Sequence, residues 1–112
     1  MQSQFRLEVT TKGGAAVIRV SGELDLATSP ALEQELERLA GEDAPLIVVD
    51  LAELEFMDST GLSVLVRAHQ RAEESGQRFG VINSSQQVQR LLTLTGVKDR
   101  LVLDRIPELD DA

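Results

Sequence analysis

The sequence contains no cysteine, tryptophan or tyrosine, and it has only one histidine and three phenylalanines. Without cysteine, disulfides, thiolate chemistry and cysteine-based metal sites are excluded. One histidine among scattered acids argues against a dedicated zinc site. Because aromatic side chains are so few, branched aliphatic residues and alanine must fill the core that the hydrophobic content of 42% supplies. This composition is typical of a small α/β layer structure.

Positive charge is also scarce, since 11 Lys and Arg face 19 Asp and Glu for a net charge of −8. An acidic surface argues against nucleic acid, whose phosphates require a basic partner, and against an anionic membrane. The N-terminal Met1-Gln2-Ser3-Gln4 lacks a basic region followed by an apolar run. No apolar segment approaches the roughly 20 residues that insert across a bilayer. We therefore expect a soluble, cytoplasmic protein.

The first quarter of the chain has the alternation of strands. Residues 5–10 alternate apolar and polar and present one buried face, formed by Phe5, Leu7 and Val9. Lys12-Gly13-Gly14 is expected to turn, and residues 16–20 resume the strand pattern, which predicts a hairpin. Gly22-Glu23-Leu24-Asp25 is then expected to form a loop.

Two stretches have helical periodicity with recognisable ends. In the first, Ser29 is the expected cap, Pro30 takes the first position and Gly41 ends the helix. The second runs from about residue 59 to 74 and is closed by Ser75-Gly76. The expected apolar faces are Leu32, Leu36 and Leu39 in the first helix, and Leu62, Leu65, Val66, His69 and Ala72 or Glu73 in the second.

Short apolar runs predict the remaining strands. Residues 46–51 are almost continuously apolar, which indicates a central strand covered on both faces. Residues 79–83 form another buried strand, and Leu101-Val102-Leu103 a last short one. Between these two, Ser84 or Ser85 is expected to cap a third helix that carries Val88, Leu91 and Leu92 and ends at Thr95-Gly96.

The resulting order is strand-strand-helix-strand-helix-strand-helix-strand. Strand-helix-strand units force parallel neighbours and right-handed crossovers. We therefore expect an α/β fold, with one mixed sheet of about four to five strands and helices packed against it. Residues 1–112 should form a single domain, with residues 107–112 as a frayed tail.

Ser59 is unfavourably placed for nucleophilic catalysis. A serine nucleophile needs a base within hydrogen-bond reach, and the only histidine is His69. On one helix, ten positions separate the two residues by roughly 15 Å along the axis. His69 also shares the apolar face of that helix, so packing explains it better than catalysis. The Gly-x-Ser-x-Gly elbow is absent as well.

Nucleotide and metal chemistry find little support. The sequence has neither a Gly-x-x-x-x-Gly-Lys-Ser/Thr loop nor a Gly-x-Gly-x-x-Gly turn. Glu23 and Asp25 could loosely bind a cation or make charged contacts, but solvated acids near a helix start are the simpler interpretation. We expect no cofactor.

The segment Asp58-Ser59-Thr60-Gly61 stands where a strand and short loop give way to a helix. Its structural explanation is an N-terminal cap, in which Asp58 accepts a bond from a first-turn N–H. A single cap does not require two further hydroxyls, however, and a glycine inside the first turn costs up to about 1 kcal/mol relative to alanine. Gly61 is explained if another molecule approaches the backbone closely. The segment is therefore also a candidate contact site.

Several segments together resemble the STAS domain of bacterial anti-sigma factor antagonists. They are Gly22-Glu23-Leu24-Asp25, the strand 46–51, Leu54-Glu55-Phe56-Met57-Asp58-Ser59-Thr60-Gly61-Leu62, Val88-Gln89-Arg90-Leu91-Leu92 and Thr95-Gly96-Val97. The resemblance covers nearly the whole chain. Its most specific part is Asp-Ser-Thr-Gly-Leu after an apolar strand.

The resemblance implies a regulatory protein that is a substrate and switch, and not an enzyme. In that family the first hydroxyl of the Asp-Ser-Ser/Thr-Gly segment is the phosphoacceptor, which corresponds to Ser59. The implied partners are an anti-sigma factor serine kinase of the histidine-kinase-like ATPase type and a metal-dependent PP2C-type phosphatase. The unphosphorylated antagonist binds the kinase and frees the sigma factor. The implied contact surface consists of Glu23, Asp25, Thr28, Asp58, Ser59, Thr60, Gly61 and Leu62.

The same family includes STAS domains that are not phosphorylated. They serve as scaffolds in signalling complexes, as accessory subunits of lipid-transport permeases and as transporter tails. Such a module would dock a protein or ligand on the same surface without turnover at Ser59. The alternative function is therefore a docking module.

Overall fold

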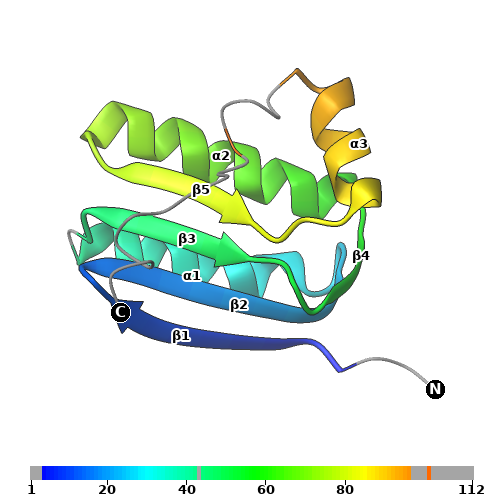
Figure 1. The fold of residues 1–112 in the computed structure, drawn as a ribbon, viewed down its shortest axis with the longest axis horizontal. Helices are drawn as coiled ribbons and strands as arrows, with labels where there is room; N and C mark the ends of the chain where they lie inside the picture. The colour runs from blue at the N-terminus through cyan, green and yellow to red at the C-terminus, as the bar shows by residue number, and fades with distance from the viewer. Residues whose placement is uncertain (1–3, 43, 97–100, 102–112) are drawn as a thin grey trace.

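The computed structural model describes residues 4–42, 44–96 and 101. In this part the chain forms a five-stranded mixed sheet with three helices, which confirms the predicted α/β class (Figure 1). The elements in chain order are β1 (Arg6–Lys12), β2 (Ala15–Leu24), α1 (Ser29–Gly41), β3 (Leu46–Asp50), β4 (Leu54–Met57), α2 (Ser59–Ser75), β5 (Arg78–Ile82) and α3 (Gln86–Leu94).

The sheet has the order β1-β2-β3-β5, and β4 pairs with β2. The β1–β2 hairpin is antiparallel, as the sequence predicts, and the other pairs are parallel. β2 has two successive partners on one edge: its residues 15–19 pair with β3, and its residues 22–24 pair with β4. The register shifts at Gly22, whose φ of +88° and close approach to the Gln4 carbonyl oxygen leave no room for a side chain.

Two predicted loops are wrong at this point. Residues 22–24 continue β2 and do not begin a loop. Residues 54–57 form β4, although the sequence predicts only a short loop between the strand 46–51 and the helix that begins near residue 59. Each segment is extended because the other supplies its hydrogen-bonding partner. Since such pairing joins residues about thirty positions apart, local turn chemistry does not reveal it.

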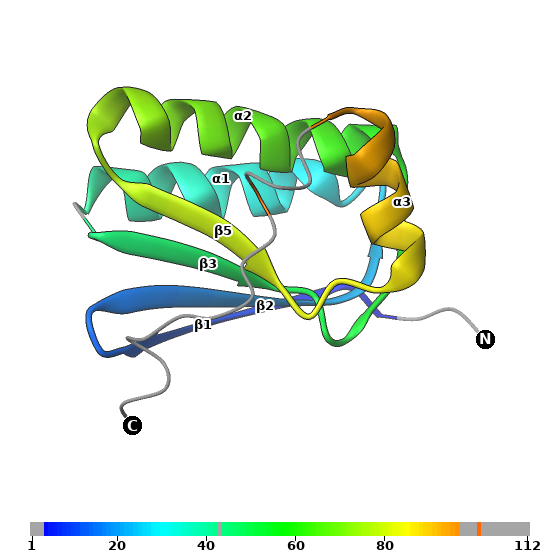
Figure 2. The ribbon, with the colours of Figure 1, turned by 45° about the horizontal axis from the view of Figure 1, so that its top comes forward.

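The helices cover one face of the sheet. Figure 2 shows α1 and α2 side by side over that face, with α3 at the end where α2 begins. The main core joins residues from all three helices to inward side chains of the strands, among them Ile18, Ile47, Val49 and Val81. All five residues of β3 are buried, as expected for a central strand. On the opposite face, Ala15, Leu46 and Val48 form a smaller cluster.

β1 differs from its prediction. Phe5 and Leu7 are only half-buried, and Val9 is 38% exposed. β1 lies at the edge of the sheet, as Figure 1 shows. The alternating pattern therefore predicts the strand correctly, but it does not ensure that the apolar face of an edge strand is fully buried.

The N-terminal caps agree with the sequence in two of the three helices. Asp58 and Ser85 cap α2 and α3, and Gly76 ends α2 with a φ of +79°. The prediction that Ser29 caps α1 is wrong, because Thr28 occupies the N-cap position. Ser29 is instead buried in the first turn, where its Oγ has no hydrogen-bond partner in the structure described.

The buried face of α2 agrees only in part with the predicted one, since Leu62, Leu65 and Ala72 are buried as predicted. Val64 and Ala68 are buried, whereas Val66 and His69 are only half-buried. The helix packs against both α1 and the sheet, so its covered face is wider than a single apolar stripe. Leu101, predicted to begin a strand, has helical backbone and is buried; residues 102, 103 and the predicted tail lie outside the described residues.

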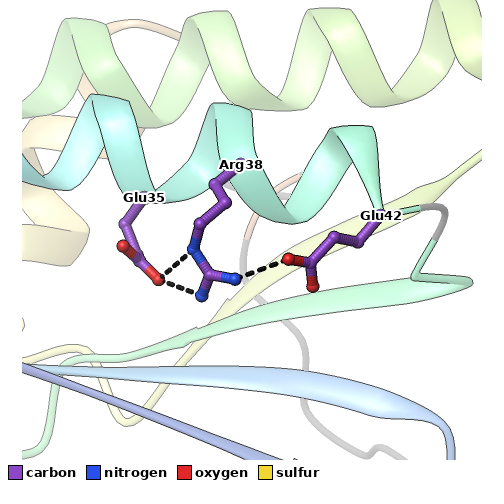
Figure 3. Close-up of polar contacts among 3 residues, drawn as sticks. All are labelled: Glu35, Arg38 and Glu42. Atoms are coloured by element: carbon purple, nitrogen blue, oxygen red, sulfur yellow. Dashed lines mark hydrogen bonds and ion pairs between the residues drawn. The ribbon is translucent and has the colours of Figure 1, made fainter.

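The outer surface of α1 carries an ion-pair cluster of Glu35, Arg38 and Glu42 (Figure 3). Arg38 Nε donates to Glu35 Oε1 at 2.9 Å, and Nη1 donates to Glu42 Oε2 at 2.6 Å. The hydrogen bond to Glu35 raises the pKa of Arg38 above its ordinary value. Because these side chains face solvent, the cluster contributes little to stability.

Candidate functional site

The residues predicted to form a contact surface gather where β2 and β4 end. The two strands are parallel, and their last Cα pair is Leu24 with Met57. One residue later, the backbone N–H of Asp58 donates to the carbonyl oxygen of Leu24 at 3.1 Å. The start of α2 is thereby fixed beside the turn that leads into α1. The residues around positions 23–28 and 58–62 therefore come together although they are distant in sequence.

The turn after β2 is held by polar contacts of Asp25 and Thr28. The carboxylate Oδ1 of Asp25 accepts from the backbone N–H groups of Ala27 at 3.0 Å and Thr28 at 3.1 Å. In return, Thr28 Oγ1 accepts from the Asp25 N–H at 2.9 Å and lies 2.8 Å from the carbonyl oxygen of Glu23, to which it can donate. Asp25 and Thr28 thus shape the surface. The Glu23 side chain is exposed on it.

Asp58 caps α2 as the sequence predicts. Its Oδ1 accepts from the Gly61 N–H at 3.0 Å, and its carbonyl oxygen accepts from the Leu62 N–H at 3.0 Å. Ser59 is exposed and Thr60 half-buried. Within the described ranges, the backbone N–H groups of Ser59 and Thr60 have no hydrogen-bond partner. The helix therefore begins with an accessible hydroxyl beside two free donors, at its positive dipole end.

Packing within the protein explains why residue 61 is a glycine, whereas the sequence suggested the close approach of another molecule. It is buried, and a Cβ built on it would lie 2.8 Å from Leu24 Cγ and 2.9 Å from Met57 Cγ. The glycine is therefore required for α2 to pack on the ends of β2 and β4, whether or not another molecule approaches. Leu62 is likewise buried in the main core. Both residues support the surface from beneath.

The arrangement gives no support to hydrolysis. His69 lies ten residues along α2 from Ser59, and its side chain is 13% exposed. Its Nε2 is 3.4 Å from Oε1 of Glu73, which lies still farther along α2 from Ser59. In the described part of the chain, no group of three or more histidine, cysteine or acidic residues could hold a metal ion. Among the helices that the structure describes, none has both the length and the apolar character needed to cross a bilayer.

Two exposed apolar side chains at the same end of the sheet were not predicted. Leu26, in the turn after β2, is 75% exposed, and Phe56, in β4, is 41% exposed. The sequence could have indicated the exposure of Phe56. Two adjacent residues of a strand point to opposite faces, so Phe56 and Met57 cannot both be buried in one core. Leu26 lies between Asp25 and Ala27 in the turn, and no local pattern in the sequence distinguishes it.

Comparison with known proteins identifies relatives along nearly the full length of the chain. An anti-sigma-B factor antagonist of Staphylococcus aureus is 30% identical over 106 residues, which cover 95% of this chain and 98% of that protein. The crystal structure of an anti-sigma factor antagonist from Mycobacterium paratuberculosis has a TM-score of 0.81 at 32% identity, covering 96% of this chain and 90% of that one. The anti-sigma factor antagonist SpoIIAA in its unphosphorylated form has a TM-score of 0.75 at 25% identity, covering 94% and 90%.

The similarity extends over the whole architecture and not only over the motif around Ser59. The STAS domain family model matches residues 6–112, which include every described strand and helix. With a match of this extent, and with relatives of the same length and fold, the chain belongs to the STAS domain family.

Proposed function

We propose that this protein is an anti-sigma factor antagonist that is switched by phosphorylation of Ser59. The observation that supports the proposal best is the exposed Ser59 hydroxyl at the first position of α2, within an intact Asp-Ser-Thr-Gly segment. The relatives at 30% and 32% identity are named as an anti-sigma-B factor antagonist and an anti-sigma factor antagonist. SpoIIAA, at 25% identity, is described in its unphosphorylated form, which presupposes a phosphorylated one.

The proposed partners are proteins. An anti-sigma factor serine kinase of the histidine-kinase-like ATPase type binds the unphosphorylated form and so releases its sigma factor. The kinase transfers phosphate to Ser59 Oγ, and a PP2C-type phosphatase hydrolyses the phosphoserine. The chain itself supplies the acceptor hydroxyl and performs no catalysis. The contact surface comprises the exposed or half-buried residues Glu23, Asp25, Thr28, Asp58, Ser59 and Thr60, supported by the buried Gly61 and Leu62.

The electrostatics of the site explain how the phosphate acts. It adds about −1.5 to −2 charges at pH 7. The dipole of α2 and the free N–H groups of Ser59 and Thr60 favour this charge by about 0.3–1 kcal/mol, and the neighbouring Asp58 carboxylate offsets part of the gain. The fold therefore tolerates the modification. At an interface, by contrast, the dianion must lose its hydration and meet nearby acids, so binding is weakened.

Phosphate transfer tests the proposal directly. The purified protein is incubated with ATP and each histidine-kinase-like anti-sigma factor encoded in the same genome, and phosphopeptides are mapped. We expect one phosphate, on Ser59, which Ser59→Ala removes and Thr60→Val retains. Phosphate on Thr60 or elsewhere would contradict the site. If the protein binds a partner but none of these kinases modifies it, the docking-module function replaces the switch.

A further inference from the structure

Large exposed apolar side chains are few among the described residues, and two of them lie at the end of the sheet where Ser59 begins α2. Four side chains of this kind are exposed: Val9 at 38%, Leu26 at 75%, Phe56 at 41% and Leu94 at 83%. A single exposed apolar residue needs no explanation. Leu26 and Phe56, however, belong to the two segments whose ends carry the proposed contact surface.

The strand register brings Leu26 and Phe56 to the end of the sheet at which Ser59 begins α2. Leu24 and Met57 are the last Cα pair of the parallel strands β2 and β4, which run about 4.8 Å apart. Leu26 and Ser59 each follow this pair by two residues, so both lie just beyond the same end of the sheet. Phe56 precedes Met57 and is therefore on the other face of β4 from the core. One apolar side chain thus comes from each strand end.

The fold does not require an apolar residue at either position. Leu26 lies in a turn whose hydrogen bonds are made by Asp25, Thr28 and backbone groups. At this point of β4 the buried side chain is that of Met57, which is 2% exposed, and not that of Phe56. A polar residue at either position would keep these contacts.

Two acids without ion-pair partners in the described ranges are neighbours of Phe56. Glu23 pairs with Phe56 across the strands, and Glu55 precedes Phe56. Both glutamates are exposed, and neither has an ion-pair partner within residues 4–42, 44–96 and 101. The surface complementary to this arrangement is an apolar recess rimmed by basic side chains.

We propose that Leu26 and Phe56 are the apolar anchors through which the unphosphorylated protein binds its anti-sigma factor kinase. This inference rests on the proposed function, and it names the contacts that phosphorylation of Ser59 would disrupt. Apolar contact supplies the affinity, and it requires water to leave the surface around Ser59. A phosphate on Ser59 holds its hydration shell at the same end of the sheet, so the recess of the kinase can no longer close over the anchors.

Calorimetric titration of purified proteins tests the anchors. The Ser59→Ala variant, which cannot be modified, is first titrated against each histidine-kinase-like anti-sigma factor of the same genome, and the kinase that binds is used throughout. In this background, Leu26→Ser and Phe56→Ala should each raise Kd about tenfold or more. Leu94→Ser and Val9→Ala are the matched controls, because they alter apolar residues of similar exposure elsewhere, and they should change Kd less than about twofold.

The outcomes separate the anchors from the switch. Urea unfolding of each variant checks that it is folded, and Leu26→Ser gives a result even if Phe56→Ala is destabilised, since Leu26 is largely exposed. If both anchor variants bind normally while Ser59→Asp does not bind, the anchor proposal is wrong and the switch stands. Losses in the control variants as large as those in the anchor variants would also overturn it. If no kinase binds Ser59→Ala, the proposed function fails, and the anchors with it.

Discussion

A methyl group on Gly61 would lie 2.8 Å from Cγ of Leu24 and 2.9 Å from its Cδ2. Leu24 is the last residue of β2 and is fully buried, so it has little freedom to move away. The glycine in the Asp-Ser-Thr-Gly segment therefore fixes how closely the start of α2 approaches the sheet. The position of Ser59 depends on this contact.

Gly61→Ala should destabilise the protein. Overpacking of a tight core contact costs about 1–3 kcal/mol, and the gain in helix propensity of at most about 1 kcal/mol offsets only part of it. The free energy of unfolding in urea measures the difference. Gly41→Ala is the control, because Gly41 lies in α1 with nothing within 4 Å of its added Cβ. It should be neutral or slightly stabilising. Equal stability of Gly61→Ala and the wild type would contradict the packing argument.

The cap of α2 depends on a side-chain oxygen at position 58. Asp58→Ala removes the acceptor of the Gly61 N–H and should lower the free energy of unfolding by about 1 kcal/mol. Asp58→Asn retains an oxygen acceptor and should lose only part of this stability. Urea unfolding of the two variants distinguishes a capping role from a role of charge. A loss in Asp58→Asn as large as the loss in Asp58→Ala would indicate that the carboxylate charge matters more than the hydrogen bond.

The turn between β2 and α1 depends on the hydroxyl of Thr28. Thr28→Val keeps the shape of the side chain but removes the acceptor for the Asp25 N–H and the donor to Glu23, and it should cost about 0.5–1.5 kcal/mol. Thr28→Ser retains the hydroxyl and should cost less. Thermal unfolding followed by circular dichroism compares them. If the valine variant were as stable as the wild type, the turn would not depend on these bonds.

Phosphorylation of Ser59 should change binding much more than stability. The helix dipole favours the phosphate, so the free energy of unfolding of the phosphorylated protein should lie within about 1 kcal/mol of the unmodified one. Binding to the kinase should fall about tenfold or more, because charge is desolvated at the interface. Urea unfolding and calorimetric titration measure the two quantities on one preparation. Unfolding caused by the phosphate would exclude this mechanism.

The variants of Ser59 should reproduce the two states of the switch. Ser59→Ala should bind the kinase constitutively, and Ser59→Asp should bind it poorly, since only the latter places a negative charge at the exposed first position of α2. Titration of both variants against the same kinase gives the ratio of Kd values. Equal affinities would show that charge at this position does not control binding.

The sequence by itself determined the elements whose signals are local. The hairpin, the buried β3, the caps at Asp58 and Ser85 and the αL glycine at position 76 all depend on residues within a few positions of one another. The order of strands and helices then requires a parallel sheet. The motif that marks Ser59 is also contiguous, so the family and the candidate phosphoacceptor were both evident before the fold was known.

Tertiary structure decided what depends on pairing between remote segments. The extension of β2 to Leu24 and the existence of β4 arise because each segment supplies the other's hydrogen bonds. The same pairing explains Gly61, since a Cβ there would meet Leu24. It also brings Leu26 to the end of the sheet where α2 begins. Exposure was likewise a tertiary property, since Phe56 and Met57 are adjacent apolar residues and only the packing of α2 on the sheet decides which is buried.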